Sequence, residues 1–316
     1  MRPSTDPVGS GVDGPVNVDL NGLGLSSPVV VASGVLPMDG EVWSSMEGVG
    51  LICTKGITLE PRAGNRGERL VETPSGLLNS IGLENPGIDR FLEAILPDLL
   101  RSRRSLGLNV AFSSLGELEE LIGRIGDRAA SVEVLELNLS CPNVDREGAV
   151  WGESPERTFE AVRLARSLWP RSVWAKLTPQ APDVAAVARA AEEAGAHCLV
   201  VANTWLGAEV DLEAGAPVFK RVVAGLSGPA LLPLTLRLLF QLYPKVSVPL
   251  VACGGICSPQ DALKAIMAGA SAVQVGTQLF RDPGCCGEIL EGIRSFLDSR
   301  ELSVSRLVGC AHRASR

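Results

Sequence analysis

The sequence predicts a (β/α)₈ barrel, an α/β fold in which inserted loops at the C-terminal mouth of the strands carry the active site. Short β-branched runs alternate with helical patterns along nearly the whole chain. The runs are apolar throughout rather than at every second position, which is typical of strands buried on both faces. Eight such units in about 290 residues match this barrel better than a doubly wound open sheet, the alternative fold.

Eight apolar runs are expected to form the barrel strands: Pro28–Gly34, Gly50–Gly56, Leu108–Phe112, Val134–Cys141, Val173–Thr178, Cys198–Thr204, Pro249–Gly255 and Ala272–Thr277. Helix signals lie between them. Ser258-Pro259 supplies an N-cap and a first-turn proline, and Gly269 follows as the expected C-terminal glycine. Ser154-Pro155 opens another helix, and Pro182 opens an alanine-rich one that stops at Gly195.

The chain divides into a tail and one barrel. Residues 1–15 are rich in Gly, Pro, Ser and Asp and are predicted to be a disordered tail. Residues 16–316 are predicted to be a single catalytic barrel domain. Segments 57–86 and 205–228 are long and turn-rich, and each follows the carboxyl end of a strand. Long loops at that end usually build the active site.

Composition excludes several classes of function. The net charge is −7, and the chain has only seven Phe, five Trp and one Tyr, so a nucleic-acid platform is not expected. The N-terminus lacks the apolar core of a signal peptide, and the apolar stretch 229–243 is too short to span a bilayer. Eight Cys without a Cys-x-x-Cys pair, and two distant His, predict no metal site. Cysteines inside apolar runs indicate free thiols in a reducing cytoplasm.

Polar residues cluster at the predicted strand ends. They are Ser33-Gly34, Lys55-Gly56, Asn109, Asn138–Asn143, Lys176 and Asn203-Thr204. Any one of them can be a loop cap or a satisfied buried amide. Together they predict a ring of amides and two lysines around one barrel mouth.

The last two strands end in Gly254-Gly255 and Gly276-Thr277. Loops after strands 7 and 8 of such barrels commonly bind a phosphate through backbone N–H groups, and glycine permits a close approach. The alternative is a pair of ordinary tight turns. No Gly-x-Gly-x-x-Gly follows a strand and no Walker A motif is present, so neither NAD nor ATP is indicated.

Cys141 differs from the other cysteines because a proline follows it and amides flank it on a predicted mouth loop. A thiol placed there can act as a nucleophile or as a general base. Cys53, Cys198 and Cys253 are interpreted as core residues.

These motifs resemble those of the dihydroorotate dehydrogenase family. The similarity rests on Asn138–Asn143 (Asn-Leu-Ser-Cys-Pro-Asn), Thr54–Gly56, Asn79–Leu83, Asn203-Thr204 and the two closing glycine motifs, in order from about Val16 to Val308. Thr58–Asn65, Glu72–Gly76 and Gly225–Ala230 are similar to the class 1B branch. Class 2 members carry Ser where Cys141 stands and have an N-terminal helix that is not seen here.

The resemblance implies an FMN enzyme that oxidises (S)-dihydroorotate to orotate in pyrimidine (UMP) synthesis. It implies Cys141 as the catalytic base. The residues implied to bind FMN are Ser33, Gly34, Lys55, Gly56, Asn109, Asn138, Lys176, Ala202, Gly228, Gly254, Gly255, Gly276 and Thr277. The residues implied to bind the substrate are Lys55, Asn79, Ser80, Ile81, Gly82, Leu83, Asn138, Asn143, Asn203 and Thr204.

The resemblance also implies partners. Class 1B catalytic chains form homodimers and join a second subunit, which carries FAD and a 2Fe-2S cluster, in a heterotetramer that reduces NAD. Three alternatives stay open. Phe112, where the family usually has Gly, and an altered loop after Asn143 allow another dihydropyrimidine or cyclic imide as substrate. A non-catalytic flavin-binding subunit is the second alternative, and a Schiff-base enzyme using Lys55 or Lys176 is the third.

Overall fold

The structure is a computed structural model that describes residues 14–140 and 150–314. Its centre is a closed barrel of eight parallel strands, in the order β10-β15-β16-β3-β4-β7-β8-β9. These strands are β3 Val29–Val31, β4 Leu51–Cys53, β7 Leu106–Val110, β8 Val134–Asn138, β9 Ser172–Lys176, β10 Cys198–Val201, β15 Leu250–Cys253 and β16 Ala270–Val275. Each lies within or beside one of the eight apolar runs, so the predicted barrel is confirmed.

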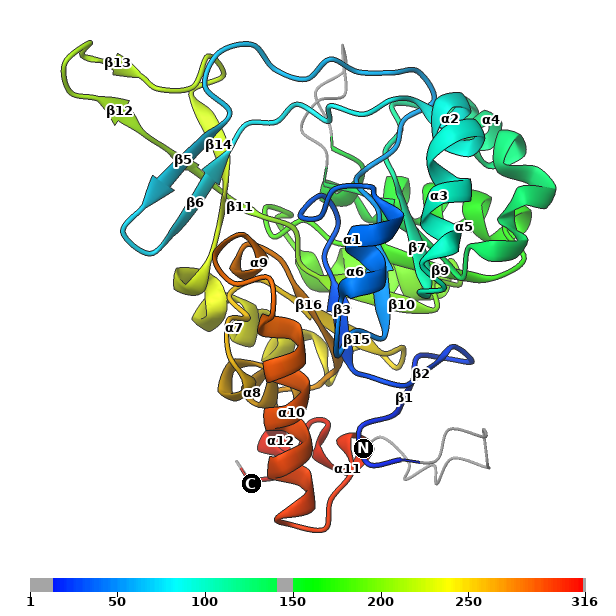
Figure 1. Ribbon diagram of the computed structural model, residues 1–316, viewed down its shortest axis with the longest axis vertical. Coiled ribbons are helices and arrows are strands. Elements are labelled where there is room, and N and C mark those ends of the chain that lie inside the picture. Colours follow the sequence, from blue (N-terminus) through cyan, green and yellow to red (C-terminus); the bar gives the residue numbers. More distant parts are fainter. Residues whose placement is uncertain (1–13, 141–149, 315–316) are drawn as a thin grey trace.

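Helices surround the barrel, one or more after each strand (Figure 1). They are α1 Gly40–Ser45, α2 Ile88–Arg90 continuing through η1 Phe91–Ile95 into α3 Leu96–Arg101, α4 Leu115–Ile125, α5 Pro155–Leu168, α6 Val184–Glu193, α7 Leu232–Leu242, α8 Pro259–Met267, α9 Gln278–Arg281 and α10 Cys285–Asp298. The N-caps follow the sequence signals. Ser154 Oγ accepts from the backbone N–H of Arg157, and Ser258 Oγ accepts from that of Asp261.

Short elements complete the chain. They are β1 Val18–Asp19 and β2 Gly24–Leu25, which form a hairpin, the turns η2 Gly126–Ser131, η3 Trp151–Glu153 and η4 Pro229–Leu231, and the C-terminal helices α11 Val304–Leu307 and α12 Ala311–Ala314. The Pro15 carbonyl accepts a hydrogen bond from the N–H of Val304. No helix in the two described stretches is long and apolar enough to cross a membrane.

The two long insertions do not remain loops. β5 Leu70–Thr73 and β6 Gly76–Asn79 from the first pair with β11 Trp205–Ala208 and β14 Val223–Ser227 from the second, in an antiparallel sheet of order β11-β14-β6-β5. A small hairpin, β12 Val210–Asp211 and β13 Ala216–Pro217, extends from it. Figure 1 shows this sheet at one end of the barrel and α10–α12 at the other. The sequence predicted the insertions but not their pairing.

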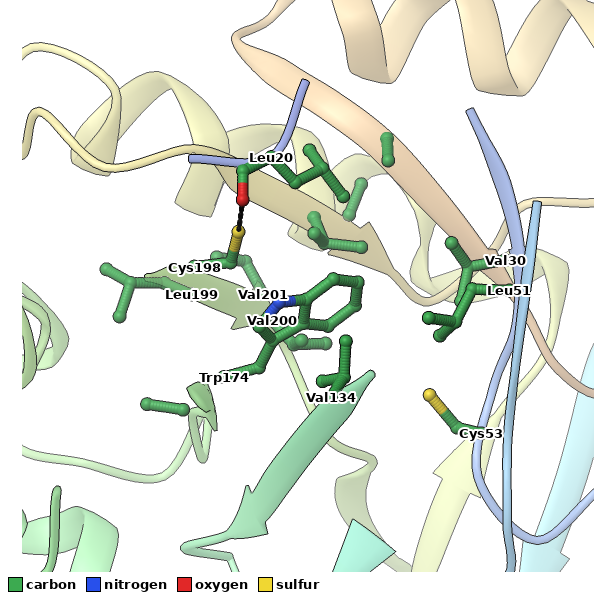
Figure 2. Packing of buried hydrophobic residues seen from close by; sticks show 14 of the residues in the cluster. Leu20, Val30, Leu51, Cys53, Val134, Trp174, Cys198, Leu199, Val200 and Val201 are labelled. Atoms are coloured by element: carbon green, nitrogen blue, oxygen red, sulfur yellow. Dashed lines mark hydrogen bonds between the residues drawn. The ribbon is translucent and has the colours of Figure 1, made fainter. Parts of the chain in front are cut away.

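Side chains fill the barrel in layers, as the two-residue period of a strand requires. Trp174 belongs to the apolar layer, and Figure 2 shows its indole near Val134 and Val200. Lys176 is two residues further along β9, on the same face, and reaches the polar layer nearer the mouth. The barrel therefore changes from an apolar floor to a polar chamber within a few residues.

His197 at the start of β10 exchanges hydrogen bonds with β9. Its N–H donates to the Val173 carbonyl at 2.8 Å, and its ring Nδ1 accepts from the Val173 N–H at 3.0 Å. Burial, aided by the Arg166 guanidinium, lowers the pKa of His197 below its ordinary value. Neutral His197 thus stabilises the fold above about pH 6.5, and this contribution is lost as the pH falls through the lowered pKa.

We expect His197→Asn to reduce the acid sensitivity of the protein. Asparagine places an amide oxygen near the position of Nδ1 and does not titrate, so the variant escapes the cost of protonation. The drop in Tm between about pH 7.5 and about pH 5 should be smaller than in the wild type by roughly 1–2 °C. Equal drops in the two proteins, measured by calorimetry, would contradict this role of His197.

Candidate active site

A cavity of about 640 Å³ opens at the carboxyl ends of the barrel strands, beneath the four-stranded sheet. Pockets for small molecules and cofactors usually have this size. Its wall contains every predicted site residue that the structure describes: Ser33, Gly34, Lys55, Gly56, Asn79, Ser80, Ile81, Gly82, Leu83, Asn109, Asn138, Lys176, Ala202, Asn203, Thr204, Gly228, Gly254, Gly255, Gly276 and Thr277. Cys141 and Asn143 lie outside the described residues.

A buried carboxylate lies behind this cavity wall, in contact with three of the residues that line it. Glu136 of β8 is fully buried, and its Oε1 accepts from Asn109 Nδ2 at 2.6 Å. Its Oε2 accepts from Gln274 Nε2, also at 2.6 Å, and lies 3.8 Å from Cys53 Sγ. Buried charges are costly unless they are paired and hydrogen-bonded, and Glu136 meets both conditions.

Lys176 of β9 supplies the opposite charge. Its Nζ lies 3.7 Å from Glu136 Oε1 and donates to Gln274 Oε1 and to Ser33 Oγ, both at 3.2 Å. Burial alone would lower the pKa of this ammonium, but the nearby Glu136 carboxylate and cysteine thiols outweigh burial and raise the pKa. Lys176 therefore stays positively charged in the wall of the cavity.

The side-chain oxygen of Asn109 has no hydrogen-bond donor among the described residues. The Nδ2 of Asn109 is committed to Glu136, and its buried Oδ1 makes no hydrogen bond among the described residues. Such atoms are rare in folded proteins and need an explanation, because an unsatisfied buried acceptor costs about 1–3 kcal/mol. Since Asn109 lines the cavity, a bound N–H donor would satisfy this oxygen.

The glycine motifs occupy another part of the wall. Gly254 and Gly255 follow β15, Gly276 and Thr277 follow β16, and η4 begins beside them after Gly228. Gly255 has φ +78°, and a Cβ there would collide with the backbone nitrogen of Leu232 in α7. Close approach of two backbone segments therefore requires glycine at this position.

Amides from both the barrel and the insertions face the cavity. Asn203 Nδ2 donates to Asn138 Oδ1 at 3.2 Å, and the Ser140 N–H donates to the same oxygen. Asn79 at the end of β6 donates from Nδ2 to the Gly225 carbonyl of β14 at 3.0 Å. These bonds orient the amides of two barrel strands and one inserted strand toward a shared space.

The described cysteines are free thiols. Cys53 and Cys198 are buried as predicted, whereas Cys253 is only partly buried and also lines the cavity. Cys257 lines it too, and burial together with Asp261 raises the pKa of that thiol to about 11. A thiol with such a pKa is a weak nucleophile at neutral pH. No group of metal-binding side chains occurs in the part of the chain that the structure describes.

Glu136 and Gln274 were not among the predicted site residues, because those residues were predicted at strand ends. Both lie inside strands, at buried positions between apolar neighbours. A charged residue in an otherwise apolar barrel strand was the signal available for Glu136. Phe112 is absent from the cavity wall: it is buried and packs on Trp151, with ring centroids 5.3 Å apart. Its bulk therefore does not shape the cavity directly.

Comparisons with known proteins agree with one another. The family model described as dihydroorotate dehydrogenase matches residues 16–297. The chain is 40% identical over 297 residues to the dihydroorotate dehydrogenase B (NAD⁺) catalytic subunit of Geobacter sp. (strain M21), covering 93% of this chain and 97% of that one. The protein of the same name from Pelobacter propionicus is 41% identical, with the same coverage.

A solved structure shares the fold. The crystal structure of DHODH from Eimeria tenella in complex with ferulenol matches with a TM-score of 0.77 and 24% sequence identity, covering 96% of this chain and 90% of that chain. At this identity the match supports the barrel architecture alone.

We expect Gly255→Ala to destabilise the protein. The methyl group would meet the backbone of α7, and a positive φ is strained for alanine, so the free energy of unfolding should fall by about 2 kcal/mol or more. Gly276→Ala is the matched control, because its Cβ would have only ordinary contacts with Ala32 and Val35, at 3.7 and 3.9 Å. Urea denaturation should show the control within about 1 kcal/mol of the wild type. Equal losses in the two variants would contradict the close-approach argument.

Proposed function

Since this chain belongs to the dihydroorotate dehydrogenase family, we propose that it binds FMN in the cavity and oxidises (S)-dihydroorotate to orotate, a step of pyrimidine synthesis. The family makes the chain an oxidoreductase. The observation that carries the proposal is a cavity with a charged lysine, an unpaired amide oxygen and a glycine-lined corner in one wall.

The wall fits FMN in three respects. The Asn109 Oδ1 needs an N–H donor, and the flavin ring carries one. Lys176 places a positive charge where it would stabilise the negative charge of a reduced flavin ring. Gly254, Gly255, Gly276 and Thr277 supply the backbone approach that a phosphate requires. Ser33, Gly34, Gly56, Ala202 and Gly228 would complete the contacts.

Amides would hold the substrate. Asn79, Asn138 and Asn203 offer donors and acceptors that match the edge of a cyclic imide. Lys55 would pair with the substrate carboxylate, and Ser80–Leu83, Asn143 and Thr204 would provide the remaining contacts. Orienting the ring before reaction removes much of the entropic part of the barrier.

Cys141 would be the catalytic base. FMN, when bound, supplies the acceptor for the hydride that leaves substrate C6. The Cys141 thiolate would take the proton from C5, so that loss of one proton and one hydride forms the C5–C6 double bond of orotate. A thiol with an ordinary pKa of about 8.5 serves as a base at neutral to alkaline pH.

The names of the relatives, which call them catalytic subunits of an NAD⁺-dependent enzyme, support a partner. We propose a homodimer of this chain joined to a subunit with FAD and a 2Fe-2S cluster, as a heterotetramer. No Gly-x-Gly-x-x-Gly follows a predicted strand, and the sequence has no Cys-x-x-Cys pair of its own. Free thiols in the described part of the chain support a reducing cytoplasm as its location.

The purified protein should be yellow and should release FMN on denaturation. Adding dihydroorotate without oxygen should bleach the flavin absorbance at about 450 nm, because the reduced ring loses its long-wavelength band. Dihydrouracil, which lacks the carboxylate, should bleach it far more slowly. A protein that takes up no FMN would contradict the flavin proposal, whereas faster bleaching by dihydrouracil would favour the other-dihydropyrimidine alternative.

Cys141→Ala should keep FMN but slow its reduction by dihydroorotate by roughly 100-fold or more, since a positioned base contributes about 10²–10⁴-fold. Cys141→Ser should retain part of the rate, shifted to higher pH. Cys257→Ala is the matched control, because that thiol lines the same cavity. Stopped-flow reduction at the wild-type rate in Cys141→Ala would identify another residue as the base.

The chain alone should reduce artificial electron acceptors well and NAD⁺ poorly. Co-expression with a subunit that carries FAD and a 2Fe-2S cluster should give a complex with iron–sulfur absorbance and NAD⁺-dependent turnover. The measurement is the steady-state rate of NAD⁺ reduction with dihydroorotate, compared between the chain alone and the complex with that subunit. Efficient NAD⁺ reduction by this chain alone would refute the proposed division of labour between two subunits.

A further inference from the structure

Glu136 controls which atoms the neighbouring side chains present to the cavity. Its two oxygens accept from the amide of Asn109 on β7 and from the amide of Gln274 on β16, and Lys176 on β9 pairs with the same carboxylate. We propose that Glu136 is a positioning residue for the flavin: its carboxylate forces Asn109 to offer an oxygen, and Lys176 to offer a positive charge, to the bound cofactor. This inference rests on the proposed FMN site.

The orientation of Asn109 follows from hydrogen-bond chemistry. An ionised carboxylate can only accept, so the amide that faces Glu136 must present its NH₂ group. The Asn109 Oδ1 then faces Gly56, and a Cβ added at Gly56 would lie 2.9 Å from this oxygen. Asn109 lines the cavity and this buried oxygen has no partner among the described residues, so a donor on the cofactor is the group that would complete it.

The orientation of Gln274 follows in the same way. Its Nε2 donates to Glu136 Oε2, which turns its Oε1 to Lys176 Nζ at 3.2 Å. Ser33 Oγ accepts a second hydrogen bond from that ammonium. Glu136 therefore holds Lys176 twice, directly by its charge and indirectly by the orientation of Gln274.

A carboxamide cannot replace this carboxylate. Glu136→Gln offers one oxygen to two amide donors, so either Asn109 or Gln274 must rotate. If Asn109 rotates, an NH₂ group replaces the oxygen that faces the cofactor. If Gln274 rotates, an NH₂ group faces the Lys176 ammonium. In either case one of the two groups that face the cofactor is altered: Asn109 presents a donor in place of an acceptor, or Lys176 loses the Gln274 oxygen that accepts from it.

The decisive variant exchanges the amide of Asn109 and the carboxylate of Glu136. This variant combines Asn109→Asp with Glu136→Gln. The amide NH₂ introduced at position 136 can donate to the carboxylate introduced at position 109, and the amide oxygen at position 136 can still accept from Gln274. The second Asp oxygen then remains an acceptor on the cavity side, and one carboxylate stays near Lys176. A purely structural role for Glu136 predicts that two substitutions do more damage than one.

The experiment measures the Kd of FMN for apo-protein by flavin fluorescence in the wild type, Glu136→Gln, the exchange variant and Glu133→Gln. Glu133 is the matched control, because it precedes the same strand and accepts from the N–H of Leu106, which does not line the cavity, whereas the partners of Glu136 do. We expect Glu136→Gln to weaken FMN binding by roughly 10- to 100-fold, the cost of an unmatched buried polar group. The exchange variant should recover to within roughly tenfold of the wild type, and Glu133→Gln should bind normally.

The outcomes separate the two proposals. A wild-type protein that does not bind FMN overturns the proposed function and this inference with it. If the wild-type protein binds FMN and Glu136→Gln binds it with the same Kd, this inference alone is overturned. An exchange variant that binds no better than Glu136→Gln also overturns it. Should Glu136→Gln fail to fold, the exchange variant decides by itself, since loss of FMN binding in a folded exchange variant contradicts the proposal.

Discussion

The Glu136 carboxylate is the constraint around which the barrel mouth is organised. A charge removed from water inside a barrel stays ionised only with a countercharge and hydrogen-bond donors around it. Lys176, Asn109 and Gln274 supply them from three other strands. Strand closure makes this possible, because β7, β8, β9 and β16 curve around a common axis and point alternate side chains at one another. The polar chamber therefore depends on the closed barrel.

The apolar layer beneath makes the polar one effective. Figure 2 shows Trp174 packed near Val134 and Val200, and all three side chains are fully buried, so the barrel interior below the polar layer is dry. With little solvent nearby, each charge and dipole acts over a lower effective dielectric and its influence on a bound group grows. The low dielectric also makes every buried polar atom without a hydrogen-bond partner costly. The unpaired Oδ1 of Asn109 therefore points to a donor on a bound ligand.

Much of this architecture could be predicted from the sequence, and the reason is local. Continuous apolar runs and capping residues such as Ser258 act within a few positions, so all eight barrel strands and the helices that begin near Ser154, Pro182 and Ser258 were predicted. Residues at strand ends, such as Asn203, could be predicted because loops follow them. Glu136 and Gln274 were missed, since their partners lie on strands distant in sequence. The pairing of β6 with β14 was missed for the same reason: the paired residues Asn79 and Gly225 are 146 positions apart, and only the closed barrel brings the two insertions together.

The cavity consequently has two halves held by different physical means. The half lined by Lys176, with Glu136 behind it, is fixed by parallel strands buried on both faces. The half with Asn79 is fixed by antiparallel pairing of two insertions, where Asn79 lies opposite Gly225 and donates to its carbonyl. A Cβ on Gly225 would meet the Thr204 hydroxyl and the Asn79 amide, so the strands can hold these groups together only with glycine there. Sequence changes in the insertions can therefore reshape the Asn79 side of the cavity while the buried carboxylate network stays intact.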